Sequence, residues 1–173
     1  MSLEEWGFRT DMLLNPLVAA FCGAMLGWNR ELKGRAAGLR TQTLVCLGAC
    51  VLTMTALELA ARYPDSNFDP LRAVSGIAGG LGFLGAGSIV QAGGSVKGVT
   101  TAATVWISGT IGLTCGIGWY PMAAITMVLT LVTLSCLGIF THFIEKERRP
   151  RPVIITEVQG GLQNVKELKQ HAD

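Results

Sequence analysis

Residues 98–144 form a run of 47 residues without a single Asp, Glu, Lys or Arg. An ionised side chain at the centre of a bilayer costs roughly 2.5–3.5 kcal/mol on insertion scales, so membrane segments exclude charge in this way. The composition agrees, because 50% of the residues are hydrophobic and 15% are charged, against about 25% charged residues in a typical globular domain. The sequence therefore predicts an integral membrane protein.

Polar and helix-breaking residues divide the apolar sequence into five segments. A helix that crosses a bilayer needs about 20 residues, so 173 residues leave no room for a large soluble catalytic domain. Asn15-Pro16 and Asp69-Pro70 each read as a helix N-cap followed by proline in the first turn. We predict an all-α polytopic membrane protein with spans at 12–28, 41–61, 71–91, 99–116 and 122–143.

The basic residues set the orientation of these spans. With five crossings, most of the Lys and Arg residues fall on one side, which the positive-inside rule makes cytoplasmic. We therefore expect a periplasmic N-terminus over 1–11, a membrane domain over 12–145 and a cytoplasmic tail over 146–173. Residues 153–158 read as a strand and 162–168 as a helix, so the tail is predicted to be a short βα unit. The basic residues on the cytoplasmic side are Arg30, Lys33, Arg35, Arg40, Lys97, Lys146, Arg148, Arg149 and Arg151.

The five cysteines all lie in apolar stretches and include no Cys-x-x-Cys pair. This pattern supports neither a disulfide framework nor a zinc site. Cys46 and Cys50 share a helix face, where two thiolates could bind a metal, but small buried packing residues are the simpler interpretation. The first residues lack the basic start and apolar core of a signal peptide.

Residues 75–87 hold six glycines in thirteen positions. Helices in lipid associate through close backbone approach at small residues, so we expect this helix to lie inside the bundle. An alternative is that the glycines let the helix unwind and present carbonyl groups to an ion. The glycines assigned to helix packing are Gly76, Gly80, Gly82, Gly85 and Gly87.

A first polar cluster lies at the expected cytoplasmic ends of spans one and two. The cluster either anchors the spans according to the positive-inside rule or forms a polar opening that binds an ion. Its residues are Asn29, Arg30, Glu31, Arg40 and Thr41.

Two further clusters are candidates for binding. Asp69 and Arg72 stand three residues apart on one helix face, so Asp69 is either a helix cap or a carboxylate that attracts a cation. Thr100, Thr101 and Trp106 open the fourth span, where the hydroxyls either satisfy backbone groups or line a small polar cavity.

No catalytic constellation is present. The sequence lacks a Ser-His-Asp set, a His-Glu-x-x-His motif and a phosphate-binding loop, so we do not expect an enzyme. The net charge of +2 is too small to suggest nucleic-acid binding. No cofactor is predicted, apart from Mg²⁺ as a candidate ion at Asp69.

Four motifs in order match a known family. They are Gly38-Leu39-Arg40-Thr41, Asp69-Pro70-Leu71-Arg72, Gly82-Phe83-Leu84-Gly85-Ala86-Gly87 and Thr100-Thr101-Ala102-Ala103 with Trp106. Over residues 12–145 the chain resembles the MgtC/SapB family of bacterial inner-membrane proteins.

The resemblance implies five spans and, in longer members, an ACT-like cytoplasmic domain of which the tail here would be the beginning. It also implies a link to growth in low magnesium and to virulence. Some members are thought to restrain the F-type ATP synthase. One departure is Asn29, because the family usually carries an acid before the arginine that ends span one.

Three hypotheses follow. The chain is a regulator that binds another membrane protein and adjusts ion or energy balance. Alternatively, it is a small oligomeric transporter or channel for Mg²⁺ or another cation, although only Asp69 and Glu58 are plausible carboxylate ligands, and both are predicted near the outer face. A third interpretation is a scaffold whose glycine-rich helix drives homo-oligomer formation in the bilayer.

Overall fold

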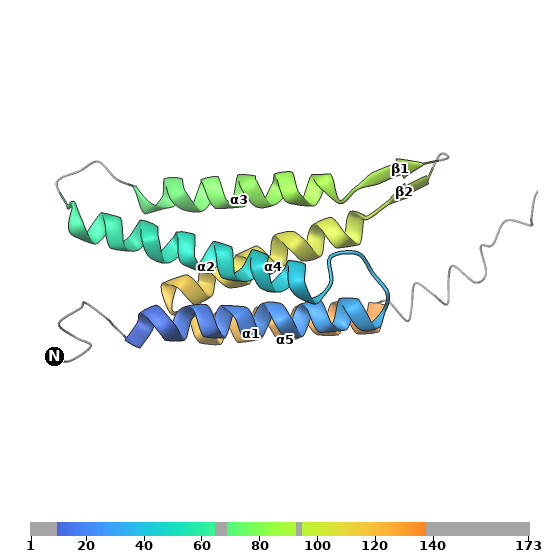
Figure 1. Cartoon of the computed structure of the whole chain (residues 1–173), viewed down its shortest axis with the longest axis horizontal. Coiled ribbons are helices and arrows are strands. Elements are labelled where there is room, and N and C mark those ends of the chain that lie inside the picture. Colours follow the sequence, from blue (N-terminus) through green and yellow to red (C-terminus); the bar gives the residue numbers. More distant parts are fainter. Residues whose placement is uncertain (1–9, 65–68, 93–94, 138–173) are drawn as a thin grey trace, which may run out of the picture. The chain divides into compact units, whose positions relative to one another are not determined.

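The computed structural model describes residues 10–64, 69–92 and 95–137. Five α-helices form most of it (Figure 1): α1 (Thr10–Leu32), α2 (Leu39–Arg62), α3 (Pro70–Gly87), α4 (Val99–Ile117) and α5 (Tyr120–Val132). A π-helical turn, Thr133–Leu137, follows α5. The predicted helical class is confirmed, and five helices are present in the described residues; that all five cross a membrane stays a prediction. The predicted βα tail over 146–173 lies outside the described residues, as do residues 1–9 of the N-terminal segment.

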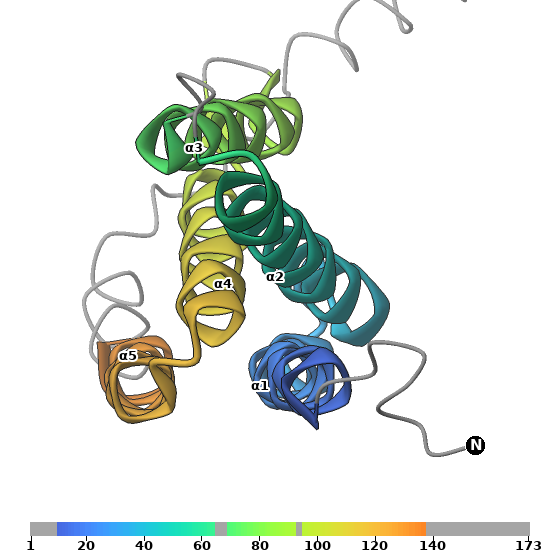
Figure 2. The ribbon, with the colours of Figure 1, turned by 90° about the vertical axis from the view of Figure 1, so that its left-hand side faces the viewer.

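Helix α4 is the central element of the bundle. In the end-on view it lies between α3, α2, α1 and α5 (Figure 2), and it packs against all four. The shared core of α1, α2, α4 and α5 contains four of the cysteines, Cys22, Cys46, Cys50 and Cys115, together with Ala19, Leu26, Ile111 and Ala123. All five cysteines are free thiols, and Cys136 alone of the five is exposed.

The closest helix contacts are made by glycines of α1 and α4. A Cβ on Gly23 would lie 2.7 Å from the carbonyl oxygen of Gln42, and one on Gly116 would lie 2.7 Å from that of Cys50. A Cβ on Gly112 would overlap the Cys46 carbonyl group. These glycines let neighbouring backbones touch, which is how helices associate where lipid supplies no hydrophobic driving force.

The glycine-rich helix α3 lies on the outside of the bundle, whereas the sequence predicted that it lies inside. Its buried residues are Leu81 and Gly85, and a Cβ on Gly85 would lie 3.3 Å from the carbonyl oxygen of Ala102 on α4. The other four predicted packing glycines, Gly76, Gly80, Gly82 and Gly87, have no atom within 4 Å of an added Cβ. The prediction that α3 is buried within the bundle of one chain is therefore wrong, because only one edge of α3 meets α4.

Two predicted helix ends, the start of α1 and the end of α3, also change. Helix α1 begins at Thr10, so Asn15 lies inside the helix and is not an N-cap. Helix α3 ends at Gly87, short of the predicted 91, and an antiparallel hairpin of β1 (Val90–Ala92) and β2 (Ser95–Lys97) follows it. Gly98, at a φ of 94°, joins this hairpin to α4. The Asp69-Pro70 start of α3 is confirmed, since the Asp69 side chain accepts a hydrogen bond from Leu71 N–H at 2.9 Å.

Helix length and composition agree with membrane insertion. Helices α1 and α2, at 23 and 24 residues, are long and apolar enough to cross a bilayer. Large apolar side chains such as Leu17, Phe21 and Leu44 are exposed on the outside of the bundle, as expected for a surface that faces lipid.

We predict that Gly112→Ala destabilises the fold by about 1–3 kcal/mol, because its methyl group would force α4 away from Cys46. Gly48→Ala on α2 is the matched control, since its methyl group meets no atom within 4 Å and should be neutral or stabilising. Thermal unfolding in detergent measures the difference. Equal stability of the two variants would contradict the close α2–α4 contact.

Candidate functional site

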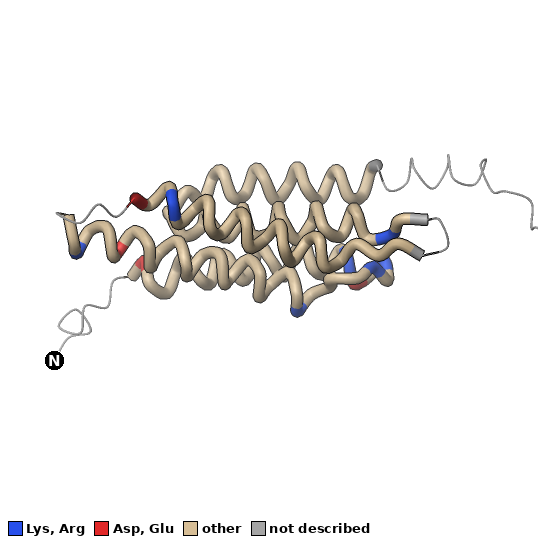
Figure 3. Tube along the Cα trace, turned by 90° about the horizontal axis from the view of Figure 1, so that it is seen from above, with Lys and Arg blue, Asp and Glu red and all other residues tan. Residues whose placement is uncertain are grey.

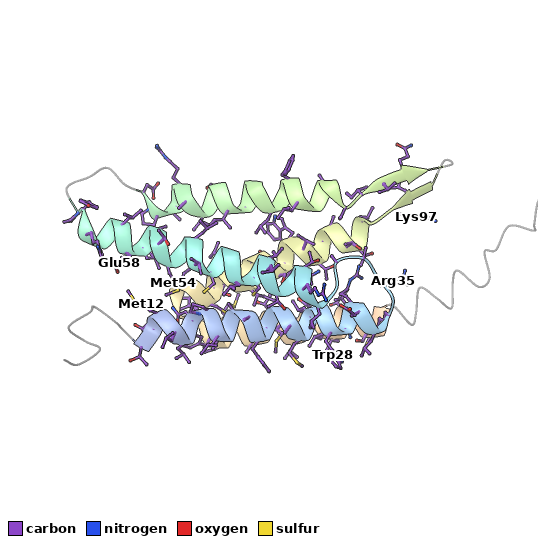
Figure 4. The ribbon with its side chains drawn as sticks, viewed as in Figure 1. Met12, Trp28, Arg35, Met54, Glu58 and Lys97 are labelled. Carbon is purple, nitrogen blue, oxygen red and sulfur yellow. The ribbon has the colours of Figure 1, made fainter. Side chains whose placement is uncertain are left out.

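The charged residues of the bundle lie toward its two ends (Figure 3). One end, called here the basic end, is where α1 finishes and α2 and α4 begin. It carries Arg30, Lys33, Arg35, Arg40 and Lys97, together with the acid Glu31 in the last turn of α1. The opposite end carries Asp11, Glu58, Arg62, Asp69 and Arg72, and Figure 4 shows Glu58 and Arg35 at these two extremes.

Arg30 lies at the centre of the basic end. It is buried, with 5% of its surface exposed. Its Nη2 donates to Thr101 Oγ1 at 2.6 Å and to the Ala36 carbonyl oxygen at 3.3 Å. The side chain therefore joins α1, the α1–α2 loop and the first turn of α4, and it unites two of the clusters that the sequence predicted separately.

The other members of the first cluster have local roles. Glu31 accepts a hydrogen bond from Leu39 N–H at 2.7 Å, at the start of α2. Asn29 donates from Nδ2 to Ser135 Oγ at 3.2 Å and so connects α1 to the turn after α5. Arg40 and Thr41 are exposed and lie away from the buried contacts.

Gln42 is a buried polar residue that the sequence analysis missed. It has no exposed surface, its Nε2 donates to the Ala37 carbonyl oxygen at 3.2 Å, and its own backbone carbonyl oxygen accepts from Ser108 Oγ at 3.2 Å. Its Oε1 has no hydrogen-bond partner. The sequence signal that could have identified it is a glutamine inside the apolar second segment, because such a side chain needs hydrogen-bond partners in lipid.

A second missed cluster holds the opposite end together. Asn15 on α1 donates from Nδ2 to the Gly116 carbonyl oxygen at 3.3 Å and accepts a hydrogen bond from the Tyr120 hydroxyl group. Asn15 thus ties α1 to the end of α4 and the start of α5. The sequence analysis missed this role because Asn15-Pro16 has the form of a helix N-cap.

The two carboxylates considered as cation ligands, Asp69 and Glu58, already have hydrogen-bond partners within the chain. Asp69 is exposed and caps α3 through Leu71 N–H, while Glu58 pairs with Arg62 at 2.8 Å one helical turn away. Arg72 is exposed on α3. Within residues 10–64, 69–92 and 95–137, no three His, Cys, Asp or Glu side chains are grouped so that they could hold a metal ion.

Two open grooves flank the core. One, of about 720 Å³, lies between α4 and α5, and Thr100 and Trp106 from the predicted third cluster line it. Thr101 points away from this groove toward Arg30, so the structure separates the two threonines. The other groove, of about 670 Å³, lies between α2 and α3 and includes Gly48, Gly76 and Gly80.

Helices of membrane-spanning length, outward-facing apolar side chains and charges at both ends define a helical membrane protein. The sequence profile of the MgtC family matches residues 17–143, and the chain belongs to this family.

Among related proteins, it is 40% identical to the protein MgtC of Salmonella typhimurium over 129 residues, which cover 75% of this chain and 53% of that protein. It is 40% identical to SrpB of Synechococcus elongatus over 69% of this chain and 70% of SrpB. It is 33% identical to SapB of Bacillus subtilis over 78% of this chain and 60% of SapB. The chain thus spans about half the length of MgtC. No solved structure matches it.

Proposed function

We propose that this chain is a regulator in the bacterial inner membrane, with its N-terminus outside and its C-terminus in the cytoplasm. It binds another membrane protein and adjusts ion or energy balance during adaptation to low magnesium. Membership of the MgtC family supports the link to magnesium, and the charge distribution of the two ends supports the orientation.

The observation that favours this proposal over ion transport is that three carboxylates are already hydrogen-bonded within the chain. Mg²⁺ takes oxygen ligands in near-ideal octahedral geometry and is usually held by carboxylates and water. Glu31, Glu58 and Asp69 each make a hydrogen bond that holds a helix end or an arginine in place. Carboxylates committed to structural bonds favour a protein that acts through its surfaces, and the F-type ATP synthase is the partner that the family resemblance suggests.

We predict that the purified protein in liposomes carries no Mg²⁺ flux above protein-free liposomes, measured with an enclosed magnesium-sensitive dye. Asp69→Asn should leave this result unchanged, because Asn also caps helices. In native membranes, the tagged chain should co-purify with a membrane complex and lower ATP-driven proton pumping. Flux that vanishes in Asp69→Asn would contradict the proposal and favour the cation transporter.

We also propose that the chain forms a homo-oligomer through the open glycine face of α3. In a helix exposed to lipid, Gly76 and Gly80, which lie one turn apart on the same face, offer a surface on which a second backbone can approach closely.

Gly80→Ile should convert this oligomer to monomers, as measured by light scattering during size-exclusion chromatography. The isoleucine meets open space within the chain, so the fold should persist. Ala124→Ile, on the exposed face of α5, is the matched control and should leave assembly intact. An unchanged oligomer in Gly80→Ile would argue against this surface.

A further inference from the structure

Two buried side chains hold the α1–α2 loop, residues 33–38, in one conformation. Arg30 comes from α1 and donates from Nη2 to the Ala36 carbonyl oxygen at 3.3 Å. Gln42 comes from α2 and donates from Nε2 to the next carbonyl oxygen, that of Ala37, at 3.2 Å. The two side chains are 5% and 0% exposed. Adjacent carbonyl groups of a surface loop are therefore fixed from inside the bundle.

The backbone of this loop is also tightly turned. Gly34 and Ala37 have φ angles of 58° and 56°, in the left-handed region that residues with a Cβ seldom adopt. Gly34 N–H donates to the Glu31 carbonyl oxygen at 2.9 Å, and the Glu31 carboxylate accepts from Leu39 N–H at 2.7 Å where α2 begins. An alanine keeps such a conformation only where its surroundings determine it, so the loop is preorganised.

The fixed loop presents cations that have no partner in the described part of the chain. Arg35 in the loop and Arg40 in the first turn of α2 are exposed, and Lys97 is exposed at the same end (Figure 4). Among the described residues, these three side chains make no hydrogen bond and no ion pair. Glu31 is the one acid that the described residues place at this end, and its carboxylate is bound to Leu39 N–H.

Membrane insertion explains the charge of this loop but not its order. The positive-inside rule depends on the number of Lys and Arg residues, and so does attraction to an anionic lipid surface. Neither requires a fixed backbone. A guanidinium group, in contrast, binds a carboxylate through two parallel hydrogen bonds of defined geometry, and a preorganised loop loses less conformational entropy when it binds. The loop thus has the properties of a surface that recognises carboxylates.

We propose that an acidic segment of a partner protein binds to the α1–α2 loop, with its carboxylates paired to Arg35 and Arg40. This inference rests on the proposed function, since the partner is the membrane protein that the chain regulates. Arg30 and Gln42 are positioning residues, because they hold the loop backbone on which the first of these arginines stands.

Binding of a fluorescently labelled oligoglutamate peptide tests this proposal. The protein is placed in nanodiscs of phosphatidylcholine, whose headgroups carry no net charge, and binding is measured by fluorescence anisotropy. Arg35→Gln and Arg40→Gln should each weaken binding about 2- to 5-fold, the upper range for an exposed ion pair. Arg72→Gln removes the same charge from the opposite end and should bind the peptide like the unaltered protein.

Two charge-neutral variants distinguish a fixed loop from one that is only basic. Gln42→Leu removes the hydrogen bond to Ala37 and fills a similar buried volume. Gly34→Val disturbs the turn from an exposed position, where no atom lies within 4 Å of an added Cβ. Both variants keep the net charge, and both should weaken peptide binding about as much as Arg35→Gln.

Four results would overturn the proposal. They are no peptide binding, equal weakening in Arg72→Gln, unaltered binding in both charge-neutral variants, and enrichment of phosphatidylglycerol that depends on Arg35 and Arg40 while the peptide does not bind. In the last case an anionic lipid surface, and not a protein, would be the partner of these arginines.

Co-purification from native membranes separates this inference from the proposed function. We expect the unaltered chain and Arg72→Gln to recover a membrane complex, and the double variant Arg35→Gln with Arg40→Gln to lose it. If the unaltered chain recovers no complex, the proposed function fails, and the peptide assay alone decides whether the loop binds an acidic segment. If the double variant recovers the complex in equal amount, the proposed function stands and this inference is wrong.

Discussion

The backbone contact between α2 and α4 is the constraint on which the rest of the structure depends. Gly112 and Gly116 remove the side chains that would hold these helices apart, and the Cys46 and Cys50 carbonyl groups fill the space. Because α4 is held this closely, Ser108 reaches the backbone of Gln42 and Thr101 reaches Arg30. Helices α3 and α5 then pack on the remaining faces of α4.

Polar side chains stabilise this core at its two ends. Asn15 joins α1 to α4 and α5 at one end, and Arg30 joins α1 to α4 at the other. Each connects residues more than 70 positions apart, so both depend on the complete bundle. The acidic side chains, by contrast, serve neighbours in sequence, as Asp69 and Glu58 do. This difference between the two kinds of side chain supports the proposal that the chain acts through its surfaces.

Charge exclusion and local capping were readable from the sequence because both depend on neighbouring residues. The five helices and the Asp69 cap followed from these signals. The position of α3 did not, because a glycine-rich face is equally suited to a neighbour in the same chain and to a second copy. Asn15 was misread since Asn-Pro has the form of a cap, and only the position of Gly116 and Tyr120 reveals its actual partners. The contact between Arg30 and Thr101 links residues 71 positions apart, which spacing alone cannot reveal.

The reactivity of the native cysteines tests the central claim, the close packing of α1, α2 and α4, most directly. The folded protein in detergent is treated with N-ethylmaleimide and digested, and the modified peptides are quantified by mass spectrometry over time. Cys136 should react rapidly, while Cys22, Cys46, Cys50 and Cys115 should react only after denaturation. Modification of Cys46 and Cys115 at the rate of Cys136 in the folded protein would contradict the account.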